Sequence, residues 1–575
     1  MQARRCVLSA LLASVLAAGS LAATGCGSGA SGTSIDPARV VPASAPLYAG
    51  AVVRPTGSLQ SSARAAAQAL THQPDPYLRL LSALQTPGSG AIDFGKDVAP
   101  WLGPRAGVFL TATGSSEQRA VERLATLLEH GILGSAGGGF PFASGSVEGA
   151  IVLDTRDAPK ARSFLQRLAK RAGAHATSYR GVSYQATAGG IAFAIVARLA
   201  VIGTDTGVHA VIDTNAGGPA LASAPSYAKL LAAAPAGALA HVYANAGAFG
   251  GSGGAQRSLS GLSLLAGSGY LNASLVPAPR SITVDADAIA AQPGASTGGL
   301  FASGTKAATA LGELPGESWL ALGLADVGHT LGADVAAIEG LASLGGGGLT
   351  GSGSEATGSG FSVKGLLAGI LAPLRALGGE NATTRRDFAS WMGSAGLFTS
   401  GTGLLELRGG AVIDSNDPAR SRAAVGELGA ILRRGGASVQ PTKIAGTETA
   451  VAVRVSGLPA VLDVAAGTGA SGRAKFVIGL GEQSVQTALN PSSTISSSAP
   501  YGTATATLGR GYQPDAIVDF PTLLGLFEGV GLSEDPSIAP LVPYLRSLTT
   551  LSAGSASLGS GIERQRLVLG LQGGG

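Results

Sequence analysis

The chain has 575 residues, of which 45% are hydrophobic and 13% charged, so it carries ample apolar material for packed cores and is not a disordered chain. Its length exceeds what one hydrophobic core usually holds, which predicts two or more domains. The net charge of +4 and the aromatic content of 5% argue against nucleic-acid binding, which needs clustered cations and stacking rings.

The N-terminus has the pattern of a bacterial lipoprotein signal. Two arginines at 4–5 form a basic start, an apolar stretch covers 7–18, and "LAATGC" (21–26) places small residues directly before Cys26. This pattern predicts cleavage before Cys26 and attachment of lipid to that cysteine. An ordinary secretory signal and an uncleaved anchor helix remain alternatives, because Ala23 stands where leucine is commoner.

We therefore expect a signal peptide at 1–25 and a flexible tether at 26–35, with the body of the protein held by its lipid at the extracytoplasmic face of the plasma membrane. No later stretch is long and apolar enough to span a bilayer. Cys6 and Cys26 are the only cysteines, so the rest of the chain can form no internal disulfide and no thiolate metal site.

Phrases of the first half return in the same order in the second half. The phrases around Trp101 and Trp391 are "KDVAPWLG" and "RDFASWMG". The other pairs are "VPASAPLYAGAVV" (41–53) with "LPGESWLALGLAD" (314–326), "IVLDTRDAPKAR" (151–162) with "AVIDSNDPARSR" (411–422), "LAVIGTDTGVHAVI" (199–212) with "KFVIGLGEQSVQTAL" (475–489), and "LAAAPAGALAHVYAN" (231–245) with "LGRGYQPDAIVDFPT" (508–522). This order is typical of a tandem duplication and predicts repeat domains at 36–290 and 305–571.

Within each copy a short strand leads into a helix. "IVLD" (151–154) has the pattern of a buried strand, and Asp157 is placed to cap the helix that follows. The buried stripe expected on this helix comprises Ala161, Leu165, Leu168 and Ala172 in the first copy and Ser421, Val425, Leu428 and Leu432 in the second.

Short strand patterns then follow, with a second short helix after each "VIG". They are "ATSYRG", "VSYQAT", "IAFAIV" and "LAVIG" in the first copy and "ETAVAVRV" and "KFVIGL" in the second. This succession predicts an α+β fold: two tandem homologous domains, each a mostly antiparallel or mixed sheet with helices on one face. The first copy adds a helix at 115–130, opened by Ser115 and Gln118, and the second a glycine-rich loop at 345–360.

Two helices could also serve in binding. The outer side of the helix at 158–172 is basic, which suits either contact with anionic headgroups or a solvated face. Its cations are Lys160, Arg167, Lys170 and Arg171. The segment 361–377 is apolar over a wide face, so we expect it either in a core or along an apolar groove.

The repeated tryptophans, Trp101 and Trp391, could stack on a ligand or anchor two cores, with Asp97 or Asp387 capping a short helix or turn. The core interpretation is favoured, because buried aromatic side chains commonly anchor cores.

Paired aspartates also recur: Asp154 with Asp157, and Asp414 with Asp417. A Ca²⁺ site would want more oxygen ligands nearby, so one member ending a strand and the other capping a helix is the favoured interpretation. None of the six histidines stands at metal-ligand spacing from another.

A family resemblance rests on several of these phrases together. They are the opening "VPASAPLYAG", the "WLG" and "WMG" phrases, the "DTRDAPKAR" junction, the "AVIG" strand and "SAPSYAKLLAAAP" (223–235). In this order they resemble the bacterial envelope family known as domain of unknown function thirty-three fifty-two, over nearly the whole mature chain. The resemblance implies no activity and no catalytic residues.

Two classes of function stay open. Neither copy shows a nucleophile–base pair or a metal set, which favours a lipid-anchored envelope protein that acts as a binding or structural module for a lipid, glycan or protein partner. The alternative is an envelope hydrolase or transferase with a site between the copies. We predict no cofactor and no catalytic residue, and the predicted site residue is Cys26, for lipidation.

Overall fold

The computed structural model describes residues 34–71, 94–111, 148–249, 269–290, 305–328, 363–378, 380–403, 406–454, 460–529, 531, 533, 539 and 541–572. Contacts divide the chain into two compact units. Unit 1 is Met1–Thr297 with Gly559–Arg564 and Gly573–Gly575, and unit 2 is Gly298–Leu558 with Gln565–Gln572.

Some of the sequence predictions concern other residues. The signal peptide at 1–25, the lipidation site Cys26, the helix at 115–130 and the loop at 345–360 lie outside the described residues. Among the helices in the described part of the chain, none combines the length and apolar character needed to cross a membrane.

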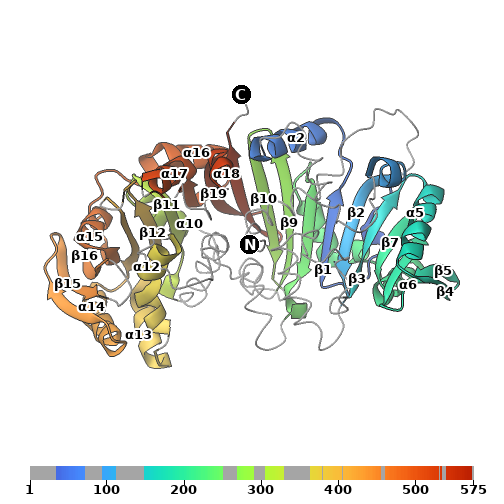
Figure 1. Cartoon of the computed structure of the whole chain (residues 1–575). Coiled ribbons are helices and arrows are strands. Elements are labelled where there is room, and N and C mark those ends of the chain that lie inside the picture. Colours follow the sequence, from blue (N-terminus) through green and yellow to red (C-terminus); the bar gives the residue numbers. More distant parts are fainter. Residues whose placement is uncertain are drawn as a thin grey trace. The chain divides into compact units, whose positions relative to one another are not determined.

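Unit 1 is built on an antiparallel sheet (Figure 1, blue to green). Its strands are β1 (Leu47–Val52), β2 (Leu102–Leu110), β3 (Gly149–Thr155), β4 (His175–Tyr179), β5 (Val182–Ala186), β6 (Ile191–Val196), β7 (Leu199–Thr204), β8 (Ala240–Asn245), β9 (Tyr270–Ala278) and β10 (Ser281–Ile289). Their order across the sheet is β10-β9-β8-β1-β2-β3-β7-β6-β5-β4. The strands expected in the first copy are all present.

Unit 2 has an antiparallel sheet of its own. Its strands are β11 (Ser318–Leu324), β12 (Met392–Ser400), β13 (Arg408–Ser415), β14 (Ser438–Thr442), β15 (Thr447–Arg454), β16 (Leu462–Thr468), β17 (Ala474–Leu480), β18 (Gln513–Asp519), β19 (Leu548–Ser557) and most of β20 (Glu563–Leu571). Their order is β20-β19-β18-β11-β12-β13-β17-β16-β15-β14. Each strand number is ten higher than its counterpart in unit 1.

Among the strands of unit 2 that were not predicted, β14 and β16 have weak sequence signals. The sequence of β14, "SVQPT", contains Pro441, which cannot donate a ladder hydrogen bond. This proline is tolerated because β14 pairs only with β15 among the described strands. The sequence of β16, "LDVAAGT", is rich in small residues with little strand preference.

The helices of unit 1 are α2 (Gly57–Thr71), α5 (Ala158–Arg171), α6 (Asp205–Asn215) and α7 (Pro225–Ala233), with 3-10 turns η1 (Pro37–Arg39), η4 (Leu221–Ser223) and η5 (Ala246–Phe249) and the π-helical turn η2 (Phe94–Val98). The helices of unit 2 are α10 (Thr305–Gly312), α12 (Val363–Gly378), α13 (Ala382–Trp391), α14 (Pro418–Arg434), α15 (Glu482–Leu489), α16 (Ala499–Leu508), α17 (Phe520–Gly529) and α18 (Val542–Arg546), with the 3-10 turn η6 (Ile495–Ser497).

The predicted helix caps are confirmed in both units. The carboxylate of Asp157 accepts a hydrogen bond from the backbone N–H of Lys160 at the start of α5. The carboxylate of Asp417 accepts from two backbone N–H groups at the start of α14. The stripe predicted on α14 is fully buried, whereas on α5 Ala172 is the exposed C-cap and Phe164 and Ala169 complete the buried face.

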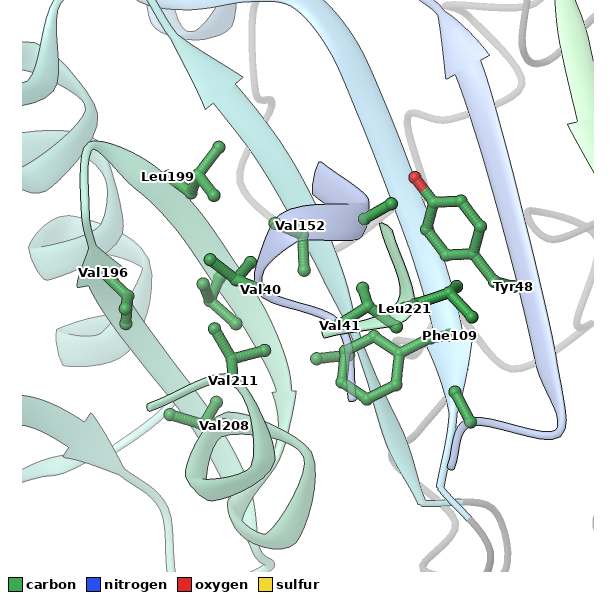
Figure 2. Close-up of a cluster of buried hydrophobic side chains, with 14 of the residues drawn as sticks. Val40, Val41, Tyr48, Phe109, Val152, Val196, Leu199, Val208, Val211 and Leu221 are labelled. Carbon is green, nitrogen blue, oxygen red and sulfur yellow. The ribbon is translucent and has the colours of Figure 1, made fainter. Parts of the chain in front are cut away.

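Helices pack on both faces of the sheet in unit 1, so the prediction of one helical face was wrong. On β7, Ala200 and Ile202 belong to the core cluster beneath α5, while Leu199 and Val201 belong to the cluster with α6. Every residue of β7 is buried, and a continuous apolar run such as "LAVIG" is typical of a strand covered on both faces. Figure 2 shows part of the second cluster.

The strand registers identify equivalent positions in the two units. Gly50 pairs with Gly107 in unit 1, and Gly323 pairs with Gly396 in unit 2. Asp154 pairs with Leu199, and Asp414 pairs with Lys475. Isolated bridges join Pro42 to Ala220 and Pro315 to Thr494. Residues in these paired strands and bridges can therefore be compared between the two units.

Candidate functional site

A cavity of about 280 Å³ lies inside unit 2, where α10, β13, β17 and α15 meet the turn between β16 and β17. Its lining residues are Ala310, Glu313, Leu314, Gly396, Val412, Asp414, Gly469, Ala470, Ser471, Lys475, Ala488, Leu489, Pro491 and Thr494. Leu314, Val412 and Leu489 give it apolar walls, and Glu313, Asp414 and Lys475 give it a charged side.

Glu313, Asp414 and Lys475 belong to a closed ring of four ionic side chains, whose fourth member, Arg473, is not part of the cavity lining. Lys475 Nζ contacts Oε2 of Glu313 at 2.7 Å and Oδ1 of Asp414. Arg473 contacts the remaining oxygens, with one guanidinium nitrogen 3.0 Å from Asp414 Oδ2 and the other on Glu313 Oε1. Each carboxylate therefore bridges both cations, and the formal charges of the ring sum to zero.

The ring has an inner and an outer pair. The side chains of Lys475 and Asp414 are 7% and 11% exposed, whereas those of Glu313 and Arg473 are 29% and 43% exposed. Ser394 also donates a hydrogen bond of 2.7 Å to Asp414. The inner pair is thus held by several partners, and the outer pair faces solvent.

In unit 1 the same place is occupied by buried apolar side chains. By register, Leu199 stands where unit 2 has Lys475, and Val40 stands where it has Glu313, two residues before the bridging proline. Val211 of α6 stands where α15 has Ala488, seven residues after each helix N-cap. Figure 2 shows these three side chains packed together with Val152, and all are buried. The cavity therefore lies where unit 2 has two charged side chains in place of Val40 and Leu199, and the smaller Ala488 in place of Val211.

A longer hairpin turn adds a wall to the cavity. In unit 1, Val196 pairs with Leu199, so β6 and β7 are joined by two residues. In unit 2, Thr468 pairs with Ala474, which leaves the five residues 469–473 between β16 and β17. The backbone N–H of Ala470 donates to the carbonyl of Leu489 at 2.8 Å, which ties this turn to the end of α15.

Trp101 and Trp391 anchor cores, as the favoured interpretation had it. Both side chains are 1% exposed. The ring of Trp101 lies 5.4 Å from that of Phe164, and its Nε1 donates to a backbone carbonyl at 2.7 Å. The ring of Trp391 lies 5.1 Å from that of Phe476. Neither tryptophan is placed to stack on a ligand.

Asp97 and Asp387 were expected to cap a short helix or turn, and neither stands at the start of a described helix. Asp97 lies inside η2, and its carboxylate pairs with Arg167 of α5 at 3.2 Å. Asp387 lies in the middle of α13, because Asn381 accepts hydrogen bonds from two backbone N–H groups and starts that helix earlier.

The paired aspartates do not converge on a metal. Asp157 and Asp417 are occupied as helix caps, while Asp154 and Asp414 are buried at the ends of β3 and β13. Within the described ranges, no group of three or more His, Cys, Asp or Glu side chains is placed to hold a metal ion.

The two candidate binding helices are ordinary parts of the fold. On α5 the four predicted cations are exposed, and two of them are paired, Lys160 with Asp157 at 2.8 Å and Arg167 with Asp97. On α12 the described side chains of the apolar face are buried, namely Ile370, Leu371, Leu374 and Leu377. The part of this segment whose side chains the structure describes is therefore core.

Each unit also buries one titratable group at an equivalent place in β8 or β18. Burial lowers the pKa of His241 to about 4, and its Nε2 lies 3.1 Å from the hydroxyl of Tyr227. Burial raises the pKa of Asp515 to about 7, although Ser555 donates a hydrogen bond to it at 3.2 Å. By exposure Asp515 is buried and His241 is half-buried, and neither residue lines the cavity.

Comparison with known proteins identifies the family. The chain belongs to the family described as "Protein of unknown function (DUF3352)", which matches residues 6–560. No curated protein matches the chain. One solved structure, entitled "Structure of crystal form I of TP0453", matches at 10% sequence identity with a TM-score of 0.24, covering 44% of this chain and 78% of its own.

The ionic ring was missed in the sequence although one signal was present. When the phrases "LAVIG" and "KFVIGL" are aligned, Lys475 takes the position of Leu199, at the start of a strand that is otherwise apolar. A lysine in such a strand is rare unless it is paired. Its partners Glu313 and Asp414 lie 162 and 61 residues away in the sequence, so their convergence could not be read from spacing.

Proposed function

We propose that this protein is a lipid-anchored binding module of the bacterial cell envelope, with the cavity of unit 2 as its ligand site. The observation that carries the proposal is the contrast at equivalent positions, where unit 1 is packed with Val40, Leu199 and Val211 and unit 2 is hollow and charged. Unit 1 keeps Asp154 as the counterpart of Asp414 but folds without counterparts of Glu313 and Lys475. The scaffold therefore does not need these two charges, and ligand binding accounts for their presence.

Binding is favoured over catalysis by the state of the polar groups. The four ionic side chains are all paired with one another, so none is a free general acid or base. Thr494, one of the lining hydroxyls, is hydrogen-bonded to Ser496 at 2.9 Å and not to a base. The other lining hydroxyl is that of Ser471. Such a lining suits recognition of a ligand without chemistry on it.

We also propose that the units are tandem homologous domains, near 36–290 and 305–571, held at the extracytoplasmic membrane face by lipid on Cys26. The matching strand order and the equivalent bridges at Pro42 and Pro315 support the duplication. The basic and apolar leader before "LAATGC" supports the anchor.

Native mass spectrometry of the purified mature protein tests the binding function. We expect a small bound molecule that is lost in Ala488→Val, which places the side chain of unit 1 in the cavity. Matching ligand content in the two proteins, or turnover in a broad hydrolase screen abolished by one substitution in the cavity, would overturn the proposal.

The anchor has a separate test. Fractionation of cells that produce Cys26→Ser should move the protein out of the membrane fraction, because its lipid attachment is lost. A variant that stays in the membrane and is processed at the same site would contradict lipidation of Cys26.

A further inference from the structure

We infer that the cavity of unit 2 accepts a small zwitterion with an apolar side chain, of the size and chemistry of a hydrophobic α-amino acid. This inference rests on the proposed binding function and names its ligand class. It follows from three properties of the cavity: its balanced charge, the exposure of one ion pair, and its size.

The charge balance selects a ligand without net charge. The ring of Glu313, Asp414, Arg473 and Lys475 is neutral as a whole, and each carboxylate contacts both cations. An anion or a cation bound here would leave one charge uncompensated in a partly desolvated site, which is costly. A zwitterion supplies both charges and leaves none unpaired.

The outer pair supplies the contact points. Arg473 and Glu313 are the more exposed members of the ring, while Lys475 and Asp414 keep each other paired beneath them. Arg473 contacts Glu313 and Asp414 but is not part of the cavity lining, so a ligand carboxylate reaches its guanidinium by taking the place of the Glu313 carboxylate. The planar guanidinium suits such a group, because arginine forms two parallel hydrogen bonds to carboxylates. The carboxylate of Glu313 can accept the ligand ammonium. The ligand thereby inserts between two opposite charges without exposing the inner pair.

The dimensions restrict the ligand further. A cavity of about 280 Å³ corresponds to roughly nine water molecules at about 30 Å³ each, which leaves room for roughly ten heavy atoms. A phospholipid or a disaccharide would not fit wholly inside it. The apolar walls of Leu314, Val412 and Leu489 face the space beside the ring and suit a short branched aliphatic side chain.

The alternative is that the ring only ties α10 to the sheet. Two observations oppose it. Replacing buried ionic groups by apolar ones is often neutral or stabilising, so a ring is a poor structural device. In unit 1 the equivalent contact is made by Val40 and Leu199, which are 4% and 0% exposed. The fold thus has an apolar solution at this place, and unit 2 departs from it.

Calorimetric titration of the full mature protein, stripped of co-purified molecules, tests the ligand class. The probes are leucine, N-acetylleucine as the anion, leucine methyl ester as the cation, and 3-methylbutanol as the uncharged analogue. We expect leucine to bind and the other three to bind at least roughly tenfold more weakly, since each lacks one charge-assisted contact or both.

Variants locate the binding. Arg473→Gln and Glu313→Gln should each weaken leucine binding roughly tenfold or more, because each removes one charged contact. Arg546→Gln, which breaks an exposed pair with Glu528 elsewhere in unit 2, should bind like the wild type. Circular dichroism and thermal unfolding confirm that each variant is folded before it is titrated.

The outcomes separate the two proposals. Equal or tighter binding of the anion, the cation or the alcohol, or no binding by leucine, overturns the zwitterion inference. If native mass spectrometry still finds another molecule that Ala488→Val excludes, the binding function stands and only the ligand class is wrong. If that variant excludes nothing, the binding function fails as well.

Discussion

Unit 1 and unit 2 share a strand order and differ in what fills one place between sheet and helices. Unit 1 packs Val40, Leu199 and Val211 there, and unit 2 has Glu313, Lys475 and Ala488 around a cavity. The comparison separates what the fold requires from what is added to it. The strands, caps and core tryptophans recur in both units, whereas the ionic ring and the longer turn at 469–473 belong to unit 2 alone.

The ring gives the largest expected effect on stability. Lys475→Leu leaves Asp414 and Glu313 with Arg473 as their only cation, so we expect unit 2 to lose about 3 kcal/mol or more of unfolding free energy. Adding Glu313→Val, the counterpart residue of unit 1, should restore most of the loss by removing the surplus carboxylate. If the losses of unfolding free energy in the two single variants add up in the double variant, the two residues are not coupled.

A large-to-small substitution in the packed core of unit 1 should lower the unfolding free energy of that unit. Leu199→Ala creates a cavity where Leu199 is 0% exposed, so we expect a cost of about 3 kcal/mol in the unfolding free energy of unit 1. Hydrogen exchange measured by mass spectrometry should show faster opening of β3, β6 and β7, with no change in β13 or β17. Equal acceleration in both sheets would break the account of two separately packed units.

His241 and Asp515 should make the stabilities of the two units depend on pH in opposite directions. His241 has a pKa of about 4 in the folded state against 6.5 in the unfolded chain, so the unfolded state binds more protons between these values and unit 1 gains stability as pH rises. Asp515 has a pKa of about 7 against 3.8, so the folded state binds more protons and unit 2 loses stability as pH rises over that window.

Hydrogen exchange between pH 4 and 7 can follow both units in one experiment, after correction for the intrinsic rate. His241→Phe should flatten the dependence in unit 1, and Asp515→Asn should flatten it in unit 2. Each variant serves as the control for the other. Slopes that the substitutions leave unchanged would assign the pH dependence to other groups.

The helix caps give the smallest effect, and it should be equal in the two units. Asp157→Ala and Asp417→Ala each remove a hydrogen bond to the first turn of α5 or α14, so each should cost about 1 kcal/mol. Chemical denaturation of both variants measures the cost. A loss in one unit only would mean that the equivalent helices are held in different ways.

The sequence allowed much of the fold to be predicted, because local patterns carry it. The alternation and burial of "IAFAIV" and "LAVIG", the aspartate caps and the stripe on α14 all depend on neighbours close in the chain. The apolar sequence of β7 indicates that both faces of the strand are covered, but it does not identify the covering elements. The helices on both faces were therefore not predicted. Asn381 was overlooked as the start of α13 because Asp387 lay nearer the repeated tryptophan.

The cavity could not be predicted, since it depends on residues brought together from distant segments. Glu313 and Lys475 are separated by more than a hundred and fifty residues and meet at the end of α10. The one local clue was Lys475 standing against Leu199 in the repeat. A comparison of the two units at equivalent strand positions shows where such a site differs from a packed core.

The most direct test of the central claim, that the charged hollow of unit 2 serves a ligand and not the fold, is the unfolding free energy of the variant Glu313→Val/Lys475→Leu/Ala488→Val, measured without ligand. This variant gives unit 2 the apolar residues of unit 1, while Arg473 remains to pair with Asp414. We predict stability equal to that of the wild type or higher by about 1–3 kcal/mol, because a packed apolar cluster replaces a buried ionic one. A loss of several kcal/mol would show that the ring holds unit 2 together, and would contradict the account.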